Sequence, residues 1–122
     1  MIAAHADSGR VLASRVTRAD DAASRSKGLL GRESLDAEEG MWIVQPPLAR
    51  LVPCPTIHTF FMKFPIDVLF LDGGLTVRRV IEEMKPWRLS PWVPSARSIL
   101  ELKGGILRGS VRAGDRLEMR PA

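Results

Sequence analysis

Cysteine, histidine and long apolar runs are all scarce in this sequence of 122 residues. Its single cysteine, Cys54, excludes a scaffold of intramolecular disulfides and lacks the paired spacing of a zinc or redox site. The absence of a long apolar run excludes a transmembrane helix. A content of 45% apolar residues is too high for a disordered tail. The length and composition therefore predict one globular domain, with no room for a second.

The N-terminal residues lack the basic and apolar segments of a signal peptide. We therefore predict a cytoplasmic protein by default, or an exported one if a leader has been removed. Residues 1–9 are predicted to be a flexible N-terminus. Residues 10–120 are predicted to form the single domain.

The charge is basic but dispersed. There are 18 Lys and Arg against 14 Asp and Glu, which gives a net charge of +4 and a pI near 10.0. A basic chain is typical of nucleic-acid binding, because Lys and Arg neutralise phosphates. Here acidic residues are interleaved throughout, and no run of four basic residues occurs. This pattern favours a solvated surface of mixed charge, so we do not expect a nucleic-acid partner.

One segment near the N-terminus has the pattern of a helix. Thr17 is a suitable N-cap, and Asp20 and Asp21 lie where a helix dipole favours negative charge. Small residues then recur at helical spacing, and Gly31 is a suitable stop. We predict a helix over residues 18–30.

The rest of the sequence is largely β-prone. Residues 66–71 are apolar apart from Asp67, which is typical of a central strand buried on both faces. Gly73 and Gly74 predict a hairpin that joins residues 66–72 to residues 75–82. Further strands are predicted at 11–16, 40–44, 97–102 and around 117–119, with one helical turn at 106–111. The predicted fold is an α+β domain rich in β-structure, with a small mixed or antiparallel sheet. A partly closed barrel is one of the forms that such a sheet can take.

Two proline-rich segments, residues 46–55 and 87–94, are predicted to be loops. The second contains Trp87 and Trp92. If it is exposed, it would be a docking surface or the rim of a pocket. The alternative is a loop that folds over one end of the barrel.

A longer motif runs from residue 57 to residue 72, and shorter motifs flank it in a fixed order. The flanking motifs are residues 25–32 and 40–43 upstream, and residues 96–105 and 114–115 downstream. Together they resemble domain-of-unknown-function family 192, a widespread prokaryotic group, over roughly residues 10–119. The resemblance implies a compact β-rich domain, and it implies no activity.

Polar residues in and around the apolar strand form a candidate site. His58, Thr59, Met62, Asp67 and Glu101 would offer an imidazole, a hydroxyl, a thioether and two carboxylates. Such a set could bind a polar ligand or carry out acid–base chemistry. A metal is not predicted, because these residues lack the local spacing of ligands. The glycines match no nucleotide-binding pattern, so we predict no cofactor.

Asp67 needs a partner, because a carboxylate in an apolar strand is costly unless it is paired. Arg79 on the facing strand and His58 are the candidates. If His58 and Asp67 pair inside a closed core, they form a structural tie that fixes the strand register. An open pocket that holds both would favour a ligand or a catalytic role.

We interpret the sequence as a non-catalytic module that binds a small ligand or a protein. Its pocket would lie near the five polar residues named above, with Trp87 and Trp92 at the rim. Two alternatives stay open, a small hydrolase that uses His58 and Asp67 and a purely structural polar tie with no site.

Overall fold

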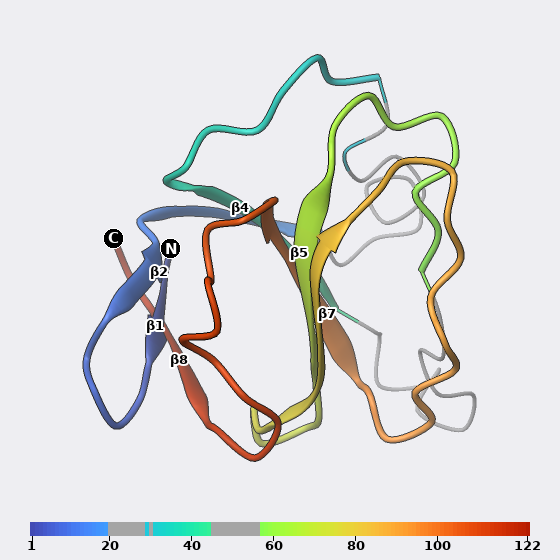
Figure 1. Cartoon of the computed structure of the whole chain (residues 1–122). Coiled ribbons are helices and arrows are strands. Elements are labelled where there is room, and N and C mark those ends of the chain that lie inside the picture. The colour runs from blue at the N-terminus through green and yellow to red at the C-terminus, as the bar shows by residue number, and fades with distance from the viewer. Residues whose placement is uncertain (20–28, 30, 45–56) are drawn as a thin grey trace.

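The computed structural model describes residues 1–19, 29, 31–44 and 57–122. This part of the chain contains β-strands and no helix, and hence no helix able to cross a membrane (Figure 1). The strands are β1 (Ile2–His5), β2 (Val11–Ala13), β3 (Arg15–Ala19), β4 (Glu39–Val44), β5 (Ile66–Leu71), β6 (Val77–Met84), β7 (Ser98–Lys103) and β8 (Leu117–Arg120). They form a three-stranded sheet in the order β2-β1-β8 and a five-stranded sheet in the order β3-β4-β7-β5-β6.

The predicted α+β class is wrong, because the start of the predicted helix is a strand. Arg18 and Ala19 belong to β3, which pairs in parallel with β4. Pairing buries Val16 and Ala19 and satisfies the backbone, and this outweighs a weak local preference for helix. Residues 20–28 and 30 lie outside the described residues, as does the predicted loop at 46–55.

The predicted helical turn at 106–111 is also not formed. Arg108 and Gly109 both have positive φ, which an α-helix does not allow. Leu107 and Val111 are nevertheless buried in one hydrophobic cluster, as their spacing suggested. The apolar spacing identified a buried segment but not its conformation.

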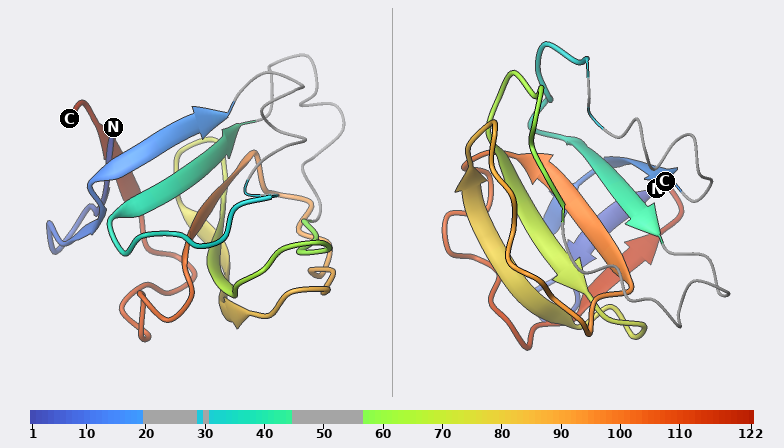
Figure 2. Two further views of the ribbon diagram at one scale, coloured as in Figure 1. Left: turned by 90° about the horizontal axis from the view of Figure 1, so that it is seen from above. Right: turned by 90° about the vertical axis from the view of Figure 1, so that its right-hand side faces the viewer.

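The two sheets pack against each other around an inner core. Buried residues of both sheets form this core, among them Ala3 and Leu117 from the small sheet and Leu69, Leu100 and Leu102 from the large one. Figure 2 shows the two layers from two directions. Each sheet keeps its own edge strands, so the predicted barrel does not close.

A second core lies on the outer face of the large sheet. Ile66, Val68 and Phe70 of β5 contribute to it, together with Ile99 of β7. Met84 of β6 and several irregular segments supply further residues, among them Leu35, Met62, Val93 and Ala96. Within the described part of the chain, loops therefore cover this face.

The hairpin of β5 and β6 confirms the prediction from the alternating pattern. All six residues of β5 are buried, as expected for a central strand. β6 pairs with it antiparallel, with irregularities between Ile66 and Val68 and between Phe70 and Leu71. The first irregularity leaves two residues of β6, Glu82 and Glu83, opposite Asp67.

The N-terminal segment forms a strand instead of the expected flexible tail. β1 lies between β2 and β8, and Ala3 and Ala4 are buried. His5 is also fixed, since its Nε2 lies 3.0 Å from Asp115 Oδ2. Because β1 and β8 are antiparallel, the two chain ends lie side by side, and the loops over the outer core lie across the molecule from them (Figures 1 and 2).

Candidate functional site

The five residues predicted to share a site lie in three places. Asp67 alternates with Ile66 and Val68 along β5, so its side chain points to the inner core. Glu101 is paired in register with Val68, so it lies on the outer face. The sheet therefore separates the two carboxylates.

Asp67 is fully buried and is held by backbone groups alone. Its Oδ1 accepts hydrogen bonds from the N–H groups of Glu83 at 2.7 Å and Gly105 at 2.9 Å. Its Oδ2 accepts a third from Leu107 N–H at 2.9 Å. Neither Arg79 nor His58 is its partner, so both predicted pairings are wrong. The carboxylate joins the irregularity in β6 to the 104–108 turn, which is a structural role.

The 104–108 turn is also held by a close approach at Gly104. A Cβ atom at this position would lie 2.8 Å from the carbonyl oxygen of Pro65, so only glycine fits without a shift of the backbone. Gly104 N–H donates to the same carbonyl oxygen at 3.2 Å. The turn is thus held by Pro65 at Gly104 and by Asp67 at Gly105 and Leu107.

Glu101 is buried without a hydrogen-bond partner among the described residues. Its side chain is 5% exposed and lies between Met41 of β4 and Val68 of β5. Burial raises the pKa of Glu101 to about 7. A carboxyl group in such surroundings is largely protonated in mildly acidic solution, because the charged form loses its hydration and gains nothing in return.

Thr59 is fully buried and joins two loops, residues 57–64 and 85–97. Its Oγ1 donates to Lys85 C=O at 2.6 Å and accepts from Arg88 N–H at 2.9 Å. Its backbone N–H donates to Arg88 C=O, and its C=O accepts from Trp87 N–H, both at 2.9 Å. The side chain and the backbone groups of this one residue thus hold the two loops together.

The two loops carry a cluster of rings on their outer side. His58 stacks on Phe60 with 5.1 Å between ring centroids. Trp87 contacts Phe61 at 4.7 Å and Phe60 at 6.2 Å. His58 also forms an isolated β-bridge with Leu89. We call these five residues, His58, Phe60, Phe61, Trp87 and Leu89, the aromatic platform.

The platform is exposed to solvent. Phe61 is 69% exposed, Trp87 56% and Leu89 64%, although all three are large and apolar. Trp92, farther along the second loop, is 65% exposed. Trp87 and Trp92 thus lie at the surface. Met62, by contrast, is buried in the outer core.

Two residues of the platform have an unfavourable backbone conformation. Phe61 has φ of 65° and Trp87 has φ of 64°. The left-handed region is unfavourable for bulky side chains and common for glycine. Such strain persists only where the surrounding structure imposes it, and it is concentrated at functional positions.

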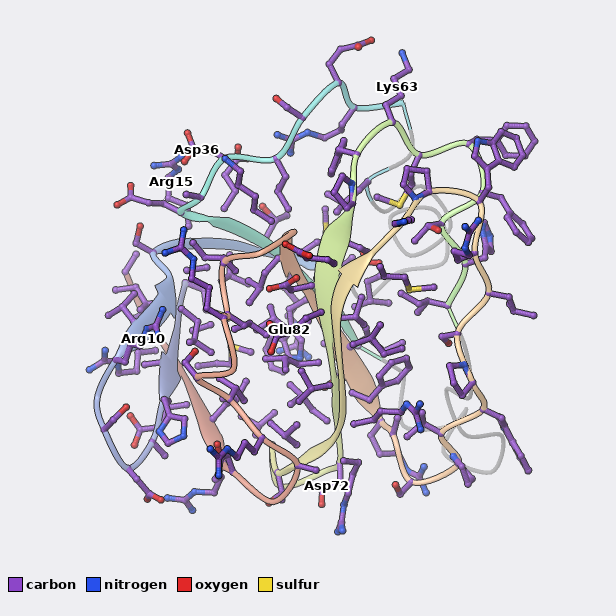
Figure 3. The ribbon with its side chains drawn as sticks, viewed as in Figure 1. Arg10, Arg15, Asp36, Lys63, Asp72 and Glu82 are labelled. Carbon is purple, nitrogen blue, oxygen red and sulfur yellow. The ribbon has the colours of Figure 1, made fainter. Side chains whose placement is uncertain are left out.

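Basic residues occur on both loops, which contain no acidic residue. The basic residues are Lys63, Lys85, Arg88 and Arg97. Lys63 pairs with Glu33 and lies at the tip of the loop before β5 (Figure 3). Arg88 and Arg97 donate only to backbone carbonyl groups. Three of these cations therefore have no carboxylate partner within the described part of the chain.

The geometry does not assemble a catalytic pair from His58 and Asp67. His58 Nδ1 accepts a hydrogen bond from Phe60 N–H at 3.3 Å, and Asp67 is saturated by backbone donors. Among the described residues, no group of three His, Cys, Asp or Glu side chains could hold a metal ion.

The sequence reasoning did not single out Phe60, Phe61 or Leu89. The available signal was the run from His58 to Phe64, which is rich in phenylalanine. Composition alone does not separate the exposed Phe61 from the buried Phe70. The left-handed backbone that turns the first outward is visible only in three dimensions.

The fold resembles two solved structures. A protein of unknown function from Novosphingobium aromaticivorans matches with a TM-score of 0.80 and 27% identity, over 97% of this chain and 83% of that one. A protein from Sinorhizobium meliloti, provisionally named as a transcription regulator, matches with a TM-score of 0.74 and 27% identity, over 96% of this chain and 89% of that one.

Sequence comparison leads to the same group. A UPF0127 protein of Pyrococcus abyssi is 39% identical over 64 residues, and one of Pyrococcus furiosus is 41% identical over 66 residues. Each match spans 52% of this chain and 54% of the relative, about half the length of both. Residues 3–119 match the family of uncharacterised proteins DUF192. As its motif order suggested, the chain belongs to the DUF192 family.

Proposed function

We propose that this protein is a non-catalytic binding module, and that the aromatic platform is its binding surface. The observation that carries the proposal is where the exposed large apolar side chains lie. Among the described residues these are Phe60, Phe61, Trp87, Leu89 and Trp92 on the two loops, and Met1 and Val11 elsewhere. A concentration of exposed aromatic residues on one surface is typical of an interaction site.

The rigidity of the loops supports a binding role. Thr59 and its four hydrogen bonds hold both loops, so the rings are presented without a large loss of backbone entropy on binding. Phe61 and Trp87 have positive φ beside hydrogen bonds from Met62 N–H and Trp87 N–H to Thr59 C=O, and both side chains are exposed. The fold thus fixes the outward direction of both rings.

The alternatives from the sequence receive less support. A hydrolase would need His58 and Asp67 in contact, and each has other partners. Asp67 acts as a structural tie, but its partners are backbone groups on the inner side of the sheet. The buried polar residues thus belong to the scaffold, and the platform is what the scaffold presents.

The experiment is to map small probes by NMR. Phenol and isopropanol are titrated into ¹⁵N-labelled protein, and amide shifts are followed along the chain. We expect the largest shifts in residues 57–64 and 85–92, because exposed rings with a fixed backbone are favourable contacts for both probes.

The control is the double variant Phe61→Ser, Trp87→Ser, which should fold and lose these shifts. A matched surface variant, Val11→Ser, should keep them, since Val11 is 46% exposed on the small sheet. Shifts that scatter over the surface, or persist in the double variant, would contradict the proposal.

A further inference from the structure

Resting on the proposed function, we propose that the partner of the aromatic platform is an anionic lipid surface. Phe61, Trp87 and Leu89 would enter the boundary between headgroups and acyl chains. Lys85 and Arg88 would lie at the level of the lipid phosphates. Rings and cations combined in this way are typical of proteins that lie on a membrane without crossing it.

The charge of the two loops favours an anionic partner. Residues 57–64 and 85–97 contain Lys63, Lys85, Arg88 and Arg97 and no Asp or Glu. Among the described residues, Lys63 has a carboxylate partner, Glu33, and the other three cations have none. Each unpaired cation near a negative membrane surface adds to the attraction, and salt weakens it.

The hydrogen bonding of the loops fits the level of the lipid headgroups. Several N–H groups of the loops have acceptors inside the protein, those of Ile57, Thr59, Phe60, Met62, Trp87, Arg88 and Ser90. The N–H groups of His58, Phe61 and Leu89 have no acceptor among the described residues. Because an unpaired N–H is costly in a region poor in water, these three residues would lie where water and headgroup oxygens can accept from them.

The position of the platform allows such docking. The two loops lie across the molecule from the three-stranded sheet and from both ends of the chain (Figure 1). Arg10, which belongs to the side of the small sheet, lies far from Lys63 in Figure 3. A flat surface can thus meet the loops first, with the rest of the domain behind them.

The test is binding to vesicles by sedimentation. One set is made of phosphatidylcholine, and the other of phosphatidylcholine mixed with phosphatidylglycerol. We expect binding to the mixed vesicles, weakened by added salt, and little binding to phosphatidylcholine alone. With Trp42→Phe as background, the tryptophan emission should shift to the blue on binding, since Trp87 leaves water.

Three variants make the test specific. Phe61→Ser with Trp87→Ser should reduce the partition onto mixed vesicles by about tenfold or more. Lys85→Gln with Arg88→Gln should remove the preference for anionic lipid. Val11→Ser, on the opposite side, should change nothing. If the double serine variant unfolds, the single variant Phe61→Gly is used in its place, because glycine keeps the left-handed backbone.

The outcomes separate the two proposals. Equal binding of the wild type and the serine variant to mixed vesicles overturns the lipid proposal, as does no binding at all. If the protein does not bind vesicles while phenol still shifts the amide signals of the platform, the proposed binding function is kept and the partner is of another kind. A poly-glutamate peptide then tests an acidic protein, and single-stranded DNA tests a nucleic acid.

Discussion

The two faces of the five-stranded sheet each bury one carboxyl group, and they treat it in opposite ways. Asp67 faces the inner core and accepts three backbone hydrogen bonds. Glu101 faces the outer core and has no hydrogen-bond partner among the described residues, and burial raises its pKa to about 7. The inner face is closed by a second sheet, and the outer face, as far as the structure describes the chain, by loops.

The difference shows that burial alone does not define a role. A buried carboxylate with a full set of donors fixes the segments that supply them. A buried carboxyl group without donors costs stability whenever it ionises. The carboxylate of the inner face therefore fixes neighbouring segments, whereas the carboxyl group of the outer face makes the stability of the fold depend on pH.

The largest effect is expected from Asp67→Asn. An amide cannot accept all three backbone hydrogen bonds, so at least one buried N–H loses its partner. We expect a loss of about 2–4 kcal/mol in the free energy of unfolding, measured with urea. Asp72→Asn is the control, because Asp72 also accepts from two backbone N–H groups and an arginine but is more exposed. If the two variants lose equal free energy of unfolding, burial does not increase the contribution of Asp67.

Glu101→Gln tests the outer face through pH. The pKa of Glu101 in the folded protein lies above its ordinary value of 4.5. Between about pH 4.5 and pH 7 the unfolded chain releases this proton and the folded chain keeps it, so the wild type loses stability as pH rises. Relative to the wild type, the Gln variant should gain about 2–3 kcal/mol over this range.

Urea unfolding at several pH values measures this gain. Other carboxylates also make stability depend on pH, because hydrogen bonds lower their pKa, as Arg112 N–H does for Asp115 and Glu38 N–H for Asp36. Their contributions are the same in the wild type and the variant, so they cancel in the difference. A difference between wild type and Gln variant that does not change with pH would mean that Glu101 ionises freely in the fold.

Thr59→Val should have a smaller effect, confined to the loops of the outer face. The substitution keeps the shape and removes the hydroxyl that bonds Lys85 C=O and Arg88 N–H. We expect a loss of about 1–2 kcal/mol and faster amide exchange in residues 85–90. Thr59→Ser keeps the hydroxyl and is the matched control. If the amides of residues 85–90 exchange equally fast in the Val and Ser variants, the hydroxyl does not hold the loops.

The smallest effect is expected from Trp42→Phe on the inner face. The Trp42 side chain is buried, and its Nε1–H has no hydrogen-bond partner within the described ranges of the chain. Loss of packing is partly offset by removal of an unpaired donor, so we expect a change within about 1 kcal/mol. A urea midpoint that moves as far as that of Asp67→Asn would mean that the indole makes an interaction beyond packing.

Sequence patterns predicted the parts of the fold in which local and tertiary preferences agree. The apolar run of 66–71 and Gly73-Gly74 identified the hairpin, because a central strand and a tight turn both leave a local pattern. The helix over 18–30 failed at Arg18 and Ala19, where pairing with β4 outweighs local preference. A parallel partner about two dozen residues away leaves no local pattern.

The candidate site failed for a related reason. Alternation along β7 correctly separates Ile99 and Glu101 from Leu100 and Leu102. Whether Glu101 meets Asp67 depends on the register between β5 and β7, in which Asp67 pairs with Leu102. An offset of one residue therefore puts the two carboxyl groups on opposite faces. The backbone donors to Asp67 come from turns that no side-chain pattern reveals.

The left-handed backbone at Phe61 and Trp87 has a consequence for laboratory selection. Glycine or asparagine at either position would relieve the strain and stabilise the fold, since these residues tolerate positive φ. A library selected only for resistance to heat or protease should therefore drift away from aromatic residues at both sites. If a second selection for the natural partner restores them, the rings are kept for that partner at the expense of stability.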